Sequence, residues 1–309
     1  MATISGNFGG IVPPLCTPLT EAFEVDRHSL QRLIEFQLDA GVHGLFVLGS
    51  TGETAFLTDA QRATVLDVAV RTVARQVPVL AGVIDMTTAR TLEHARTAQK
   101  AGVDGIVMTA PFYTRISQVE LVEHFRLVHS ALDLPLLAYD IPVGVQTKIA
   151  RETMLQMVSD GLIIGVKDSS GDEANFRALV MEREHFKTFL TFTGSEVLVD
   201  TALQMGACGA VPGLANVDPA GYMRLYQAAQ VGDWHLARLE QERLIRLFSL
   251  VAAGTPGRMG TGSSAMGGFK TALLLRGVIA ANVVGRPQIR LNAQEMSKVQ
   301  HALSEAQLL

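Results

Sequence analysis

The sequence predicts a (β/α)8 barrel, a closed ring of eight parallel strands covered on the outside by helices. Short apolar runs alternate with longer amphipathic segments along the chain, and this is the pattern of parallel strands joined by helices. Eight such apolar runs follow one another in series. The length of 309 residues also suits one large domain, because single barrels commonly have about 250 residues or more.

Each predicted strand is short and rich in Val, Ile or Leu. The strands are expected at residues 11–16, 44–48, 77–83, 105–109, 134–139, 163–167, 190–193 and 208–211. Hydrophobic residues make up 48% of the chain but aromatic residues only 6%, which suits buried parallel strands under closely packed helices. An open doubly wound sheet is the alternative that the same alternation allows.

A recurrent segment favours the closed barrel. Residues 40–49, 101–110 and 205–214 each hold a Gly that would end a helix, a two-residue link, a second Gly and then a strand. Gly suits the left-handed conformation that ends many helices, and the second Gly lets strand and helix approach closely. The first two segments lie two βα units apart. This Gly spacing is also common in ordinary helix–strand loops, so duplication and loop chemistry both explain it.

Helix starts and a helical tail complete the predicted architecture. Residues 58–61 (TDAQ) and 117–120 (SQVE) have the spacing of capping boxes, and Asp218-Pro219 places an N-cap before a proline at the first helical position. A barrel of residues 1–232 is expected to carry a helical extension of residues 233–309. The extension is predicted to contain helices 233–252, 266–280 and 293–307 and a loop at 254–262.

Composition excludes several classes of protein. The formal net charge is -4 and no basic stripe occurs, so we expect no nucleic-acid partner. No run of about 18 apolar residues predicts a membrane span, and residues 1–10 lack the basic start and apolar run of a signal peptide. Cys16 and Cys208 form no CxxC pair. We therefore expect no structural disulfide and a cytoplasmic location.

Lys167 is the candidate catalytic residue because it ends the apolar strand in LIIGVKDSSGD. Barrel active sites lie at the carboxyl ends of the strands, and no other lysine ends a predicted strand. A desolvated lysine can react as a neutral amine with a ketone and form an imine. The protonated imine is an electron sink, so an adjacent C–C bond can break or form without a metal. The alternative is a lysine that extends its ammonium group to solvent.

Two further elements supply groups that such a reaction needs. Tyr139 ends the preceding strand in LPLLAYDIP, and its phenol could relay protons beside the lysine; a core tyrosine is the alternative. Residues 49–53 (GSTGE) follow the second strand and offer backbone N–H groups and two hydroxyls to a carboxylate. Many turns have this composition, and Glu53 is interpreted as a turn or helix-start residue rather than an acid catalyst.

With these motifs in order, the chain resembles the dihydrodipicolinate synthase/N-acetylneuraminate lyase family of pyruvate-handling class I aldolases. The resemblance covers essentially the whole chain and rests on GSTGE (49–53), YDIP (139–142) and GVKDSSGD (165–172). It implies a (β/α)8 barrel with a three-helix extension and an imine lyase that needs no cofactor or metal. It also implies a homo-oligomer, a dimer or a tetramer built from dimers.

The resemblance assigns roles to individual residues. Lys167 is similar to the Schiff-base lysine of the family, and Tyr139 to the tyrosine that moves protons beside it. Ser50 matches the hydroxyl that links to this tyrosine, and Thr51 matches the adjacent carboxylate-binding position. Tyr113, in APFYTRIS, resembles the tyrosine that some members contribute from a neighbouring subunit.

Two more substrate-binding positions are implied near the last strands. Gly194 follows the seventh strand and matches a glycine of the substrate pocket. Val211, in GAVPGLAN, matches the strand position whose backbone carbonyl faces the lysine. The eight histidines mostly fall on predicted helices without a strand-end cluster, so no metal site is expected.

Departures from the family pattern concern the second half of the substrate. Dihydrodipicolinate synthases usually carry an arginine shortly after the YN(I/V)P motif, and this arginine binds the carboxylate of the second substrate. Gly144 occupies that place here, and Asp140 replaces the usual Asn. Sialic acid lyases tend to have a serine near the position of Gly213, and this chain has PGLAN there.

We therefore expect a lyase that cleaves or dehydrates a 2-oxo-3-deoxy sugar acid or a related 2-oxo acid. One alternative is dihydrodipicolinate synthesis with Lys148 or Arg115 as the carboxylate anchor. The other is a non-catalytic 2-oxo-acid-binding regulatory barrel, whose signature would be loss of Lys167 or Tyr139. Both residues are present.

Overall fold

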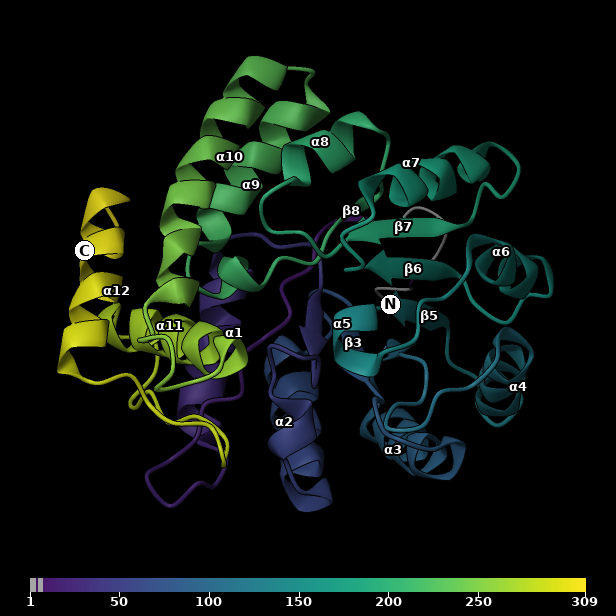
Figure 1. Cartoon of the computed structure of the whole chain (residues 1–309), viewed down its shortest axis with the longest axis horizontal. Coiled ribbons are helices and arrows are strands. Elements are labelled where there is room, and N and C mark those ends of the chain that lie inside the picture. Colours follow the sequence, from purple (N-terminus) through teal and green to yellow (C-terminus); the bar gives the residue numbers. More distant parts are fainter. Residues whose placement is uncertain (1–3, 5–7) are drawn as a thin grey trace.

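The strands of the computed structural model form one closed parallel barrel (Figure 1). The structure describes Ile4 and residues 8–309, so most of the segment in which we expect no signal peptide lies outside the described residues. The strand order is β1-β8-β7-β6-β5-β4-β3-β2. The ring closes between the segment after β1 and β2, where Leu15 N–H donates to the Phe46 carbonyl at 2.8 Å. The predicted (β/α)8 barrel is confirmed, and the open sheet is wrong.

The observed strands overlap the eight predicted segments. They are β1 Gly10–Ile11, β2 Leu45–Val47, β3 Val79–Gly82, β4 Gly105–Met108, β5 Leu136–Asp140, β6 Gly165–Asp168, β7 Leu190–Thr193 and β8 Gly209–Ala210. The largest difference is β1, because the strand predicted over residues 11–16 ends at Ile11. Pro13 and Pro14 follow, and a proline has no N–H to donate to a neighbouring strand.

Helices cover the outside of the barrel, and one short helix in the loop after β5 instead lines a cavity with Gly144 and Val145. They are α1 Arg27–Asp39, α2 Asp59–Val73, α3 Thr88–Ala101, α4 Gln118–His129, α5 Pro142–Val145, α6 Arg151–Ser159, α7 Glu173–Met181, α8 Val199–Gln204 and α9 Pro219–Gln230. Both predicted capping boxes are present, at the starts of α2 and α4. Asp218 caps α9 with Pro219 in the first turn, as predicted. None of the described helices combines the length and apolar composition that crossing a membrane requires.

The carboxyl-terminal segment adds α10 Trp234–Phe248, α11 Thr261–Leu275 and α12 Ala293–Glu305, which lie together on one side of the barrel (Figure 1). The second of these helices was expected to begin at residue 266, and it begins at Thr261. Gly262 weakens the helical signal of the first turn, and the predicted loop therefore extended to it. Within the helix, Gly268 is required by packing, because a Cβ there would lie 2.4 Å from the Leu250 carbonyl oxygen.

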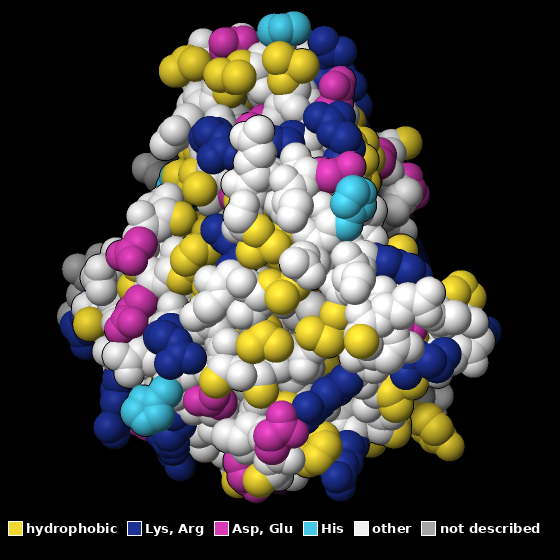
Figure 2. Space-filling model, turned by 90° about the vertical axis from the view of Figure 1, so that its left-hand side faces the viewer, with side chains coloured by type: hydrophobic (Ala, Val, Ile, Leu, Met, Phe, Trp, Pro, Cys, Tyr) yellow, Lys and Arg dark blue, Asp and Glu magenta, His cyan; other side chains and the backbone are white. Residues whose placement is uncertain are grey.

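Two apolar clusters organise the interior. One fills the barrel and includes Phe46, Leu137, Tyr139, Phe192 and Val211. The larger one lies between strands and helices and continues into the carboxyl-terminal helices. The surface on that side carries interspersed acidic and basic side chains, with no continuous basic area on the visible face (Figure 2).

Candidate active site

Tyr139 and Lys167 face each other across adjacent strands at the carboxyl end of the barrel. They are register partners in β5 and β6. Lys167 Nζ lies 4.0 Å from the centroid of the Tyr139 ring and 5.4 Å from that of Phe46. Tyr139 is 3% exposed and Lys167 is 6% exposed. The structure thus brings the two predicted catalytic residues together in a largely desolvated, aromatic setting.

A cavity of about 340 Å³ opens around the lysine, and we call it the lysine cavity. The cavity is lined by Lys167 and Tyr139 and by three residues that the resemblance implies as substrate-binding: Thr51, Gly194 and Val211. Four separate strand ends and loops therefore converge on the lysine. The space suits a small 2-oxo acid bound to Nζ.

Gly194 is required by the close approach of its neighbours. A Cβ at this position would lie 1.9 Å from Ser169 Oγ and 3.0 Å from Lys167 Cε. The Gly194 N–H also donates to the Asp168 carbonyl at 2.6 Å. A side chain here would force the Ser169 side chain to move and would crowd the lysine, which gives the predicted pocket glycine a steric reason.

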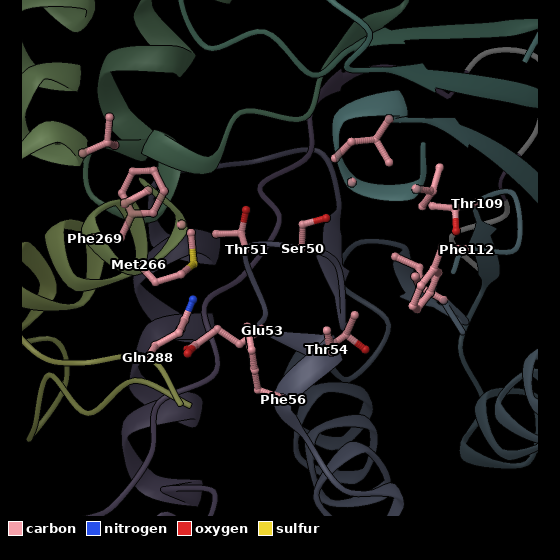
Figure 3. Close-up of a pocket in the computed structure, with 18 of the residues that line it drawn as sticks. Ser50, Thr51, Glu53, Thr54, Phe56, Thr109, Phe112, Met266, Phe269 and Gln288 are labelled. Atoms are coloured by element: carbon pink, nitrogen blue, oxygen red, sulfur yellow. The ribbon is translucent and has the colours of Figure 1, made fainter. Parts of the chain in front are cut away.

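A second cavity of about 520 Å³ adjoins the first, and we call it the tail cavity (Figure 3). Thr51, Ile141 and Glu196 line both cavities and form the junction between them. Ser50 lines only the tail cavity of the two. No hydrogen bond joins Ser50 to Tyr139 in the part of the chain that the structure describes, so the expected link between these hydroxyls stays a prediction.

Glu53 fixes the loop that carries Ser50 and Thr51. Its backbone is left-handed, with φ 58°, and its carboxylate forms a buried ion pair with Lys270 of α11. The other carboxylate oxygen accepts the Gly285 N–H at 2.6 Å. The carboxylate is thus engaged in structure, which agrees with the interpretation of Glu53 as a turn residue and not an acid catalyst.

Tyr113 lies apart from the lysine cavity of its own chain. It is 88% exposed and has φ 80°, a backbone conformation that is uncommon for residues other than glycine. The preceding residue, Phe112, lines the tail cavity. Tyr113 therefore does not reach the lysine of its own chain. It could relay protons only in the site of a neighbouring copy, as the resemblance implied.

Glu196 is a residue of both cavities that the sequence did not single out. Its Oε1 accepts the Gly213 N–H at 3.1 Å. Burial raises the pKa of Glu196 above its ordinary value, and the charge of Lys167 opposes this shift. A carboxyl group at the junction of the cavities can therefore hold or release a proton near the substrate. Its position just past a strand end was the signal available in the sequence.

Lys148 is not free to bind a substrate carboxylate. It forms an ion pair with Asp140 and lies 3.9 Å from Asp168 Oδ2. These two aspartates are register partners on β5 and β6, and strand alternation turns them away from the barrel interior. Burial raises the pKa of Asp140, and Lys148 counteracts that shift. Arg115, the other proposed anchor, is exposed and lines neither cavity.

A buried lysine over a tyrosine ring at the mouth of a (β/α)8 barrel is the arrangement that the sequence led us to expect of an imine-forming lyase. The chain belongs to the dihydrodipicolinate synthetase family, because the sequence model of this family matches residues 7–306. It is a lyase of that family, as the resemblance implied. A 4-hydroxy-tetrahydrodipicolinate synthase of Phenylobacterium zucineum is 32% identical over 252 residues, which are 81% of this chain and 84% of the relative. An uncharacterised DapA-like lyase of Halobacterium salinarum is 34% identical over 87% of this chain and 84% of the relative.

Solved structures agree with this assignment. YagE, a prophage protein of the dihydrodipicolinic acid synthase family from E. coli K12 that was solved with pyruvate, superposes with a TM-score of 0.91. It is 27% identical, over 98% of this chain and 99% of YagE. Dihydrodipicolinate synthase from Bacteroides thetaiotaomicron gives a TM-score of 0.90 at 32% identity, over 96% of this chain and 98% of that one.

Proposed function

We propose that this lyase binds pyruvate or a larger 2-oxo acid as an imine on Lys167 and makes or breaks the C–C bond beyond C3. The observation that carries the proposal is the buried Lys167 Nζ, 4.0 Å from the Tyr139 ring centroid. An amine in this setting reacts with a ketone without first losing a shell of water. Thr51 and the N–H groups of its loop supply the carboxylate site.

The reaction follows from these groups. The Lys167 amine adds to the C2 ketone, water leaves, and a protonated imine forms. In cleavage, the C4 hydroxyl loses its proton while the C3–C4 bond breaks, which releases an aldehyde and leaves an enamine. Protonation of C3 and hydrolysis of the imine then return pyruvate and the free lysine. Tyr139 and Glu196 are placed to carry the protons.

The same imine allows dehydration. Removal of a C3 proton then lets the C4 hydroxyl leave as water. Because the imine itself accepts the electron pair, we propose that neither a metal nor an organic cofactor takes part. Activity that persists after dialysis against EDTA would agree with this, and its loss with recovery on adding a divalent metal would contradict it.

Pyruvate trapping tests the imine directly. Incubation with pyruvate and borohydride should reduce the imine and add a stable mass to one peptide, the one that contains Lys167. Lys167→Arg is the matched control, because it keeps the positive charge but cannot form this adduct. No adduct at saturating pyruvate, or an adduct on another lysine, would refute the proposal.

We also propose a homo-oligomer, a dimer or tetramer, in which Tyr113 of one copy serves the site of another. Its 88% exposure leaves the phenol available for such a contact. Sedimentation and turnover of Tyr113→Phe test this, and a variant with unchanged turnover would remove Tyr113 from the mechanism. With both cysteines free, a reducing cytoplasm is the compartment we propose.

The second candidate is 4-hydroxy-tetrahydrodipicolinate synthase, the name carried by relatives such as that of P. zucineum. It would condense pyruvate with aspartate semialdehyde. Gly144, at the place of the usual arginine, lines the tail cavity, and Lys148 is paired with Asp140. Turnover with pyruvate and aspartate semialdehyde would favour this candidate.

A further inference from the structure

We propose that the partner half of the substrate is apolar, and that the tail cavity takes the alkyl or aryl group of an aldehyde. The inference rests on the proposed function, because it places the 2-oxo acid on Lys167. It departs from the sugar acid that the sequence led us to expect. It is supported by the apolar side chains that line the cavity and by the absence of a cation among the described residues of its wall.

The tail cavity is the space into which a substrate on Lys167 would extend. Thr51, Ile141 and Glu196 line both cavities, so atoms beyond C3 of a bound 2-oxo acid pass between them. The volume of about 520 Å³ is within the range of small-molecule sites. An aromatic ring or an alkyl chain of several carbons fits such a space.

Most of the wall is apolar. Its largest apolar side chains are Phe56, Phe112, Phe248, Met266 and Phe269. Figure 3 shows Met266 and Phe269 on one side of the cavity and Phe112 on the opposite side. These residues come from the loop after β2, the loop after β4, and the carboxyl-terminal helices, so the apolar surface surrounds the space.

The polar side chains of the wall are outnumbered by apolar ones, and some of them are already engaged. Within the described residues, no lysine, arginine or histidine lines the tail cavity. The Glu53 carboxylate is held by Lys270 and the Gly285 N–H. The Thr109 hydroxyl donates to the Ala110 carbonyl at 2.9 Å. A carboxylate or phosphate on the substrate tail would therefore meet no cation.

Two oxygens of the wall, Thr54 Oγ1 and Gln288 Oε1, are buried without a partner within the described residues. Ser50, Thr51 and Glu196 add further polar groups to the wall, and together these can serve a few hydrogen-bonding groups on the substrate. Hydroxyls placed against the aromatic side chains and Met266 would find no partner there, and each would lose its bonds to water. An apolar tail gains free energy on leaving water.

The reaction with such an aldehyde is balanced by the groups already described. C3 of the pyruvate enamine on Lys167 forms a bond with the aldehyde carbon. The aldehyde oxygen takes a proton and becomes the C4 hydroxyl. Water then hydrolyses the imine, which returns the Lys167 amine and releases a 4-hydroxy-2-oxo acid. The reverse sequence cleaves the same acid.

A set of aldehydes tests the inference in the full-length wild-type protein. Pyruvate is supplied with benzaldehyde, hexanal, glyceraldehyde or aspartate semialdehyde, and aldol product is quantified to give kcat/KM for each aldehyde. We expect benzaldehyde or hexanal to exceed the other two by about tenfold or more, since differences of a few buried groups give such ratios. A preference for glyceraldehyde or aspartate semialdehyde, or no reaction with either apolar aldehyde, would overturn the inference.

Borohydride trapping of pyruvate, run in parallel, tests the imine on Lys167 separately from the preference for an apolar aldehyde. Trapping at Lys167 with the wrong aldehyde preference refutes only the apolar tail. Absence of trapping refutes the proposed function itself. The two failures are therefore distinguishable in one set of reactions.

A pair of variants locates the tail. Met266→Gln places an amide of similar size in the cavity wall and should raise KM for the preferred apolar aldehyde about tenfold, with pyruvate trapping unchanged. Met181→Gln is the matched control, because Met181 is 64% exposed and lines neither cavity. Equal KM values for the two variants would show that the tail does not occupy this cavity.

Discussion

The buried ion pair between Glu53 and Lys270 should control both stability and the active-site loop. Lys270 is 0% exposed, and its Nζ also donates to the Val283 carbonyl at 2.7 Å. Lys270→Met removes the counter-ion and leaves a buried carboxylate unpaired, which costs about 3–5 kcal/mol of unfolding free energy. Urea unfolding measures this loss. KM for pyruvate should rise as well, because Glu53 holds the loop that carries Thr51.

The double variant Glu53→Gln/Lys270→Met isolates the cause. It removes both charges, and glutamine keeps an acceptor for the Gly285 N–H, so most of the lost stability should return. Lys100→Met is the control for loss of an exposed lysine and should change stability by less than about 0.5 kcal/mol. A cost below about 1 kcal/mol for Lys270→Met, or a double variant no more stable than the single one, would refute the argument.

Three further predictions concern separate parts of the molecule. Gly194→Ala should nearly abolish borohydride trapping of pyruvate, because the methyl group would overlap Ser169 Oγ and crowd Lys167 Cε; trapping at the wild-type rate would contradict this. Gly144→Arg is a suitable test, since a Cβ at Gly144 meets one neighbouring side chain at 3.6 Å and no backbone. It should raise kcat/KM for aspartate semialdehyde, and steady-state kinetics that show no increase would count against the assignment of this position. Burial lowers the pKa of His124 from 6.5 to about 4, so the unfolded chain binds this proton first as pH falls. Stability should therefore be lost between pH 6.5 and about 4, by about 3 kcal/mol; urea unfolding of wild type and His124→Gln at pH 7 and 4.5 measures it, and equal losses would exclude the histidine.

The fold was predictable because its signals are local. Apolar runs and capping boxes report on a few adjacent residues, and the structure confirms eight strands and the caps of α2, α4 and α9. The errors lie at the boundaries of elements. Gly262 was assigned to the loop before α11, yet the helix begins at Thr261. Pro13 and Pro14 lie within the strand predicted at residues 11–16, and β1 ends before them at Ile11.

The position of Tyr139 beside Lys167 was also predictable, and the reason is register. Tyr139 and Lys167 end neighbouring strands, so parallel pairing places them together. The same alternation turns Asp140 and Asp168 outward, where Lys148 meets them. The positions of the strand ends in the sequence thus also distinguish Lys167, which faces the barrel interior, from Lys148, which pairs with Asp140.

The tail cavity was not predictable from the sequence, because its walls come from segments that no local pattern connects. Met266 and Phe269 lie on α11, more than 200 residues beyond the GSTGE loop, and reach the tail cavity because Lys270 ties α11 to Glu53. The ion pair therefore positions the loop of Ser50 and Thr51 and the apolar wall together. A change in α11 can alter the preferred aldehyde without touching Lys167. Exchange of the partner substrate with retention of the imine chemistry is what this arrangement permits.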